Sequence, residues 1–269
     1  MLNTNRRQFL RAAAFGVTGV LVARGVSAQA PASAGPADPK LIEDLVAANR
    51  ILADQGVVDG YGHVSVRHPA DPQRYLMSRS IAPELVTAAD IMEFDLDSFA
   101  VDARGRTTYL ERFIHGEIYR VRPDVVAVVH NHSPSVIPFG VSTAPLRPLY
   151  HMSAFLGSGV PVFDIRKASA QPTDMLVRDA ALGRALAQTL GARPVALMRG
   201  HGAVVVGPSV PVVVFRSVYT EMNARLQAQA MALGPVTYLD DEEARRAEAS
   251  VGGTIPRPWE LWKKKALVR

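Results

Sequence analysis

Two short runs of aliphatic residues constrain the fold of this chain more than any other feature. Residues 125–129 are Val-Val-Ala-Val-Val, and residues 195–198 are Val-Ala-Leu-Met. Runs that are this short and continuously apolar are typical of strands covered on both faces. Helical patterns flank them at residues 38–55, 111–122, 173–190 and 210–233. The sequence therefore predicts an α/β chain whose central strands are buried on both sides.

Local signals define the elements around these runs. Asp38 and Pro39 are typical of a helix start, and Gln55-Gly56 of its end. Alternation over residues 63–67 and 75–78, with a turn rich in Pro and Asp between them, predicts a hairpin. Residues 91–95 form a third expected strand. We expect one helix over residues 173–190 and a long irregular loop over residues 134–161.

Histidines follow both aliphatic runs. His130 and His132 come directly after the first run, and because side chains alternate along a strand, both imidazoles should lie on one face. His201 follows the second run between Gly200 and Gly202, which let another backbone or a ligand approach closely. His-x-His alone is also compatible with an ordinary polar strand end, because so short a motif is unspecific. The three histidines are the candidate metal ligands.

The chain contains no cysteine. This excludes disulfides, iron–sulfur clusters and thiolate ligands, so a metal has to be bound by histidine and carboxylate side chains. Three neutral imidazoles leave coordination positions open for a substrate, which is typical of catalytic sites. We expect one divalent ion per chain, zinc first, with manganese, iron and cobalt as alternatives.

Glu111 stands at the start of the helix that leads into the histidine-bearing strand. It lies four residues before His115, so the two side chains are expected to share a helical face. A carboxylate beside a bound metal can move protons to and from a reacting carbon, which makes Glu111 the candidate catalytic residue. A glutamate in a first helical turn is equally expected from the helix dipole alone.

Basic charge is concentrated at the N-terminus. The formal net charge is +5, and residues 1–28 hold four arginines and no acid, so the remainder carries +1. A nearly neutral body argues against a nucleic-acid partner. Arg6-Arg7 before a weakly apolar stretch predicts a twin-arginine signal over residues 1–30, then a linker over 31–38. We expect a periplasmic protein without stable membrane association, because the apolar stretch is too short to span a bilayer.

Several motifs occur in a fixed order along the chain. Gly62-His63-Val64-Ser65-Val66-Arg67 precedes Glu111-Arg112-Phe113-Ile114-His115-Gly116-Glu117-Ile118-Tyr119, and then come Arg122-Pro123-Asp124-Val125, His130-Asn131-His132 and His201-Gly202. This ordered set resembles the class II aldolase/adducin family. The resemblance implies a single three-layer α/β/α domain with a central, mainly antiparallel sheet over residues 39–235, and a C-terminal arm over 236–269. It also implies a homotetramer, metal ligation by His130, His132 and His201, and an acid/base role for Glu111.

Two positions depart from the sugar-phosphate members of that family. Those members hold the phosphate with a Gly-Asn pair and a Ser-Ser pair, where this chain has Gly62-His63 and Tyr109-Leu110. Losing small donors removes the closely placed hydrogen bonds that a phosphate dianion needs. The segments around Glu111 and His201 are instead similar to the branch that contains 3-hydroxy-2-methylpyridine-4,5-dicarboxylate decarboxylase.

The expected activity is that of a metal-dependent lyase that breaks a carbon–carbon bond next to an oxygen-bearing carbon, by decarboxylation or aldol cleavage. Its expected substrate is a small unphosphorylated hydroxy or oxo carboxylate, aromatic compounds included. His63, Arg79, His151 and Arg199 are candidate substrate contacts, because arginine offers a planar fork and histidine can donate or accept. A surface ion pair or an ordinary loop histidine is the alternative at each position.

Two other functions stay open from the sequence. One is a sugar-phosphate aldolase or 4-epimerase, and the other is an adducin-like binding protein without catalysis, against which the retained histidines and Glu111 argue. At the C-terminus, Trp259 and Trp262 precede three lysines. Two aromatic residues make a weak membrane anchor, so we expect this arm to pack on a neighbouring subunit.

Overall fold

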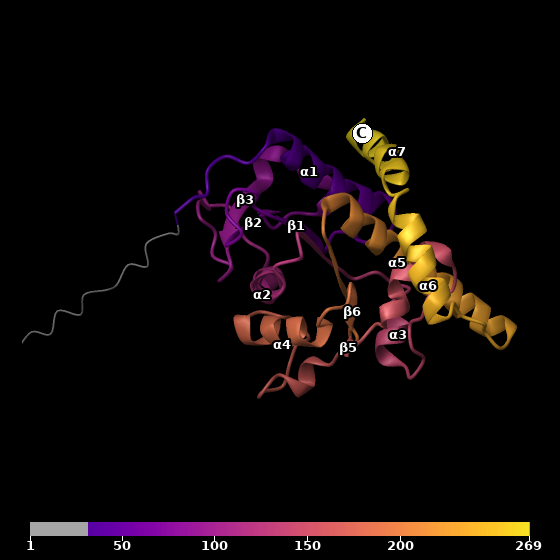
Figure 1. Ribbon diagram of the computed structural model, residues 1–269. Helices are drawn as coiled ribbons and strands as arrows, with labels where there is room; N and C mark the ends of the chain where they lie inside the picture. The colour runs from indigo at the N-terminus through magenta and orange to yellow at the C-terminus, as the bar shows by residue number, and fades with distance from the viewer. Residues whose placement is uncertain (1–31, 269) are drawn as a thin grey trace, which may run out of the picture.

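A single seven-stranded sheet crosses the molecule in the computed structural model, which describes residues 32–268 (Figure 1). The strand order is β3-β2-β1-β4-β7-β6-β5, and all neighbours are antiparallel except β5 and β6. The strands are β1 (His63–Arg67), β2 (Arg74–Ser78), β3 (Ile91–Asp95), β4 (Ala127–Asn131), β5 (Val162–Phe163), β6 (Val195–Met198) and β7 (Gly202–Gly207). The expected mainly antiparallel sheet is confirmed. The expected signal over residues 1–30 lies outside the described residues.

Helices cover both faces of this sheet (Figure 1). They are α1 (Pro39–Asp54), α2 (Phe113–Val121), α3 (Ile137–Val141), α4 (Ala180–Leu190), α5 (Val210–Leu233), α6 (Asp241–Gly252) and α7 (Pro256–Leu267). One hydrophobic cluster joins Leu45 of α1 to Val129 of β4, and a second joins Ile114 of α2 to Val128 of β4. Because Val128 and Val129 are neighbours on one strand, these clusters lie on opposite faces of the sheet. The three-layer α/β/α arrangement is therefore confirmed.

Two expected segments differ from the structure. The helix expected from residue 173 begins only at Ala180, because Asp179 caps it by accepting a hydrogen bond from the Leu182 N–H at 2.9 Å. Met175 has a positive φ of 75°, which an α-helix cannot contain. The loop expected over residues 134–161 contains α3 and a 3-10 segment, His151–Ser158.

The C-terminal helices fold back on their own chain. Trp259 of α7 is 5% exposed and belongs to the same hydrophobic cluster as α1. Lys263 reinforces this contact, since its Nζ lies 2.6 Å from carboxylate oxygens of both Glu43 and Asp44 on α1. The expectation that this arm packs its tryptophans on a neighbouring subunit is wrong for Trp259, because the chain buries that side chain itself. Among residues 32–268, no helix has both the length and the hydrophobicity needed to cross a membrane.

Candidate metal centre and active site

Four side chains converge at the end of β4. His130 lies in β4, His132 follows it, His201 lies in the turn between β6 and β7, and Glu111 lies in a 3-10 turn before α2. His132 Nε2 is 3.2 Å from His130 Nε2 and 3.0 Å from His201 Nε2. Glu111 Oε2 is 3.4 Å from His130 Nε2 and 3.3 Å from His201 Nε2. All four ligand atoms lie within 4.8 Å of one another.

The two glycines beside His201 allow this convergence. β4 and β7 pair with Asn131 opposite Ala203, which brings the start of β7 against the end of β4. A Cβ atom on Gly202 would lie 2.0 Å from the Asn131 carbonyl oxygen, so any side chain there would separate the two strands. Gly200 has a φ of 64°, a conformation that glycine adopts without strain. The approaching group is therefore backbone, one of the two outcomes expected from the sequence.

Backbone carbonyls set the tautomers of two of these histidines. His130 Nδ1 lies 3.2 Å from the Ala203 oxygen, and His201 Nδ1 lies 2.9 Å from the Met175 oxygen. A carbonyl oxygen only accepts, so both Nδ1 atoms carry hydrogens, and in the neutral imidazoles both Nε2 atoms present bare lone pairs to the cluster. Lone pairs of nitrogen and a carboxylate oxygen therefore face one another across about 3 Å, an arrangement that a cation stabilises. This donor set fits a divalent metal ion.

The charge states of Glu111 and His132 suit metal ligation. Although burial opposes protonation of His201, the Glu111 carboxylate raises its pKa, so a bound metal ion would take the place of a proton there. Burial opposes ionisation of Glu111, but the contacts with His130 and His201 hold the pKa of this carboxyl well below its usual range. Burial and the neighbouring His130 and His201 lower the pKa of His132 to about 4. A carboxylate and a neutral imidazole are the forms that bind metals.

The segment between β5 and α4 orients the cluster and was missed from the sequence. Met175 supplies the carbonyl that holds His201, and the Val177 N–H donates to Glu111 Oε1 at 2.8 Å. Both groups are backbone atoms of the segment that we expected to be helical. The sequence signal that could have separated it from α4 is Asp179, a strong N-cap residue.

A cavity of about 530 Å³ adjoins the cluster. Its walls are mainly aromatic and aliphatic side chains, three of which carry a hydroxyl group (Tyr61, Ser80 and Tyr109); the others are His63, Ile81, Ala82, Leu110 and Leu176. Glu111, His130 and His132 complete the lining together with two glycines. Within the described part of the chain, neither lysine nor arginine lines this cavity. The site thus combines a metal cluster with largely apolar walls.

Only one of the four candidate substrate contacts lines this cavity. His63 does so, and its ring centroid lies 4.5 Å from that of Tyr109. Arg79 forms an ion pair with Asp90 at 2.6 Å, and Arg199 forms one with Asp164 at 2.9 Å. Both arginines are held by carboxylates of their own chain.

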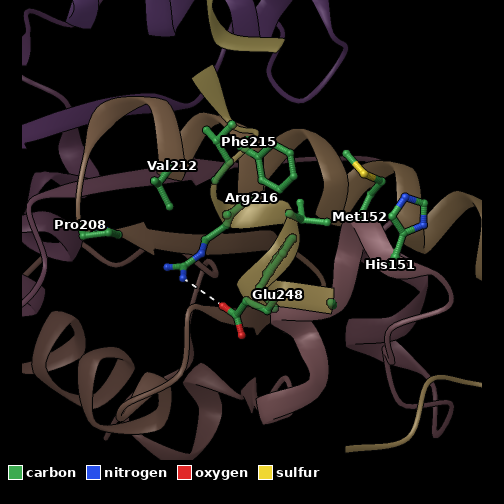
Figure 2. A pocket seen from close by; sticks show the side chains of 12 residues that line it. His151, Met152, Pro208, Val212, Phe215, Arg216 and Glu248 are labelled. Carbon is green, nitrogen blue, oxygen red and sulfur yellow. Dashed lines mark hydrogen bonds and ion pairs between the residues drawn. The ribbon is translucent and has the colours of Figure 1, made fainter. Parts of the chain in front are cut away.

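His151 lies at a different pocket. It lies beside Met152 (Figure 2) and lines an apolar pocket between the 3-10 segment, α5 and α6. The volume of this pocket is about 210 Å³. The Arg216–Glu248 ion pair, at 3.5 Å, borders this pocket. The structure therefore does not bring His151 to the metal cluster within the chain.

His115 is likewise not a partner of Glu111. The helix starts only at Phe113, and Glu111 has φ and ψ of −89° and 18°, outside helical values. His115 instead bonds to His63 and Ser65, with 2.6 Å between each pair of atoms. The expected shared helical face does not form, because the helix begins after Glu111.

The amino-acid sequence is similar to that of a known enzyme family. The domain model described as Class II Aldolase and Adducin N-terminal domain matches residues 43–228. The decarboxylase tropJ of Talaromyces stipitatus is 37% identical over 244 residues, which cover 82% of this chain and 92% of tropJ. The 3,4-dihydroxyphthalate decarboxylase of Arthrobacter keyseri is 31% identical over 207 residues, covering 71% of this chain and 79% of that protein.

Solved structures share the fold. L-fuculose 1-phosphate aldolase from Glaciozyma antarctica superposes with a TM-score of 0.71 at 22% identity, over 84% of this chain and 88% of that one. The matched domain and the decarboxylase relatives show that the chain is an enzyme, a lyase of decarboxylase or aldolase type, and not a non-catalytic adducin-like protein. By its matched domain, its sheet and its relatives, it belongs to the class II aldolase and adducin family.

Proposed function

We propose that this protein is a metal-dependent decarboxylase of hydroxylated aromatic carboxylates. The observation that carries the proposal is the metal cluster beside a cavity with aromatic and aliphatic walls, whose described lining holds no lysine or arginine. A phosphate dianion would lack closely placed donors there. A flat ring fits such walls and leaves its carboxylate and hydroxyl for the cluster. The names of the relatives tropJ and 3,4-dihydroxyphthalate decarboxylase support this class of reaction.

Each part of the site has a task in this reaction. Glu111, His130, His132 and His201 would hold a divalent ion, whose Lewis acidity polarises substrate oxygens. The apolar walls exclude water from the bound ring. When the carbon–carbon bond breaks, its electron pair stays on the ring carbon, CO₂ leaves and that carbon gains one proton. The Glu111 carboxylate would take up a proton from a substrate hydroxyl and pass it to that carbon, and the oxygen that gave up the proton regains one from water as the product leaves.

The direct test is CO₂ release by the zinc-loaded protein. We expect CO₂ from 3,4-dihydroxyphthalate and none from phthalate, because phthalate lacks the hydroxyl that binds the cluster and supplies the proton. L-fuculose 1-phosphate, assayed for aldehyde, tests the sugar-phosphate alternative under the same conditions. Aldehyde from this compound, with no CO₂ from any hydroxylated aryl carboxylate, would overturn the proposal.

Export by the twin-arginine route is also proposed, on the basis of Arg6-Arg7 in the sequence. The double variant Arg6→Lys, Arg7→Lys should remain in the cytoplasm at precursor mass, because the transport signal depends on the arginine pair. Immunoblots of periplasmic and cytoplasmic fractions measure this. Arg24→Lys, in the same segment, is the control and should be processed normally. Normal processing of the double variant would show that the pair is an ordinary basic start.

The homotetramer expected from the family remains a prediction. Sedimentation velocity of the protein from residue 31 onward, at micromolar concentration, measures its mass directly. A monomer under these conditions would contradict the expectation.

A further inference from the structure

A chain of buried hydrogen bonds leads from the cavity into the core beside α2. His63 Nδ1 lies 2.6 Å from His115 Nε2, and His115 Nδ1 lies 2.6 Å from Ser65 Oγ. Ser65 Oγ lies 2.7 Å from the Tyr119 hydroxyl, which lies 3.3 Å from the Val126 carbonyl oxygen. All four side chains are at most 3% exposed. We call this chain of four side chains the relay. Of its members only His63, at one end, lines the cavity.

All members of the relay are neutral. Burial lowers the pKa of His115 to about 3. Burial also raises the pKa of Tyr119 above its usual range. In the described structure neither His63 nor His115 hydrogen-bonds to a carboxylate, and Glu111 contacts His130 and His201 instead, so a positive charge on either imidazole would be buried without a hydrogen-bonded counter-ion. Each of the four side chains therefore contributes one hydrogen to the relay.

Counting these hydrogens leaves two possible states. The three contacts inside the relay take one hydrogen each, and the fourth is left for one of the two ends. In the first state, Tyr119 donates to the Val126 carbonyl, every hydrogen points the same way, and His63 Nε2 is a bare acceptor. In the second state, every hydrogen is reversed and His63 carries a hydrogen on Nε2. The described residues place no hydrogen-bond acceptor on His63 Nε2, so only the first state pairs all four hydrogens within the protein.

We propose that the His115–Ser65–Tyr119 relay holds His63 in its Nδ1–H tautomer, so that Nε2 faces the cavity as a hydrogen-bond acceptor for a substrate hydroxyl. His115, Ser65 and Tyr119 are positioning residues, since they act through His63. The Val126 carbonyl determines the direction, because it accepts and cannot donate. The proposed tautomer of His63 does not depend on which reaction the protein catalyses. That the group bonded to His63 Nε2 is a ring hydroxyl of the substrate rests on the proposed function.

The tautomer is measurable without any substrate. In zinc-loaded protein labelled with ¹⁵N-histidine, NMR correlations distinguish a hydrogen on Nδ1 from one on Nε2, and the His63 signals are assigned by their loss in His63→Gln. Wild-type His63 should show the Nδ1–H form. Tyr119→Phe leaves the Ser65 hydroxyl with His115 as its only acceptor, which reverses the relay and moves the His63 hydrogen to Nε2.

Two further variants make this test decisive. Ser65→Ala should also give the Nε2–H form, because a hydrogen left on His115 Nδ1 would be a buried donor without a partner. Tyr75→Phe is the matched control and should leave His63 unchanged. Tyr75 is equally buried near His115, but its hydroxyl bonds to Ser98 and lies outside the relay. An Nε2–H tautomer in the wild type, or a His63 signal that Tyr119→Phe and Ser65→Ala both leave unchanged, would overturn the proposal.

Kinetics separate this proposal from the proposed function. With a hydroxylated aryl carboxylate, Tyr119→Phe should raise KM about tenfold and change kcat less, because an Nε2–H group can only donate to the substrate hydroxyl, whose own hydrogen then loses its acceptor. If no such compound releases CO₂ while the tautomers behave as described, the proposed function fails and the relay stands. If CO₂ is released and the tautomers do not respond, only the relay fails.

Discussion

His132→Ala is expected to remove the bound metal and, with it, the activity. The wild-type protein should contain about one divalent ion per chain, bound by three imidazoles and a carboxylate. His132 Nε2 lies within 3.2 Å of both other ligand nitrogens, so its loss opens the centre of the cluster. Elemental analysis of the purified variant measures the metal. Melting curves give a second readout, because zinc at a hundredfold excess over its Kd stabilises a folded protein by about 2.7 kcal/mol.

The control for this experiment is another histidine-to-alanine change. His151→Ala alters an exposed side chain at a separate pocket and should retain the full metal content and the zinc-dependent rise in melting temperature. Stoichiometric metal in a triple variant lacking His130, His132 and His201 would refute the metal centre.

Glu111→Gln is expected to lower turnover about 10²–10⁴-fold, the usual loss when a general acid–base group is removed. The Val177 N–H still has an oxygen to donate to, so the amide should occupy the place of the carboxylate. The three histidines still bind the ion, whereas the amide cannot take up or release the proton. Turnover and metal content, measured on the same preparation, test both statements.

Added metal distinguishes the two roles of Glu111. If its main role is proton transfer, excess zinc leaves the turnover of Glu111→Gln low. Recovery of the rate with excess zinc would mean that Glu111 is mainly a ligand. If Glu111→Gln has the full metal content and wild-type turnover, Glu111 has neither role and is only a carboxylate at the start of a helix. Glu117→Gln is the matched control, because this buried glutamate of α2 pairs with Arg120 and Arg184 instead of facing the cluster.

Local patterns predicted the sheet well, and the three histidines that they singled out converge with Glu111 in one cluster. The expected strand over residues 63–67 and the helix over residues 210–233 match β1 and α5. The strand expected over residues 125–129 begins and ends two residues later in the structure, as β4 (Ala127–Asn131), and therefore includes His130. These predictions succeed because apolar periodicity and capping depend on residues close together in sequence.

The surroundings of the ligands depended on contacts that span the chain. Met175 and Val177 act through backbone atoms, which every residue carries, so no side-chain pattern identifies them. Arg79 and Arg199 have ordinary arginine chemistry, and only the fold shows that Asp90 and Asp164 hold them.

The relay shows the same division between sequence and structure. His115, Ser65 and Tyr119 are all present in the sequence motifs, yet Ser65 is 50 residues from His115 and 54 from Tyr119. They meet because α2 packs against β4 and its His115 and Tyr119 bond to side chains of β1. The pairing of β1 with β4 sets His63 opposite His130. The sequence by itself determined which residues can bind a metal. The tertiary structure decided which hydrogen-bond partner each of them faces, because that depends on packing between segments far apart in the chain.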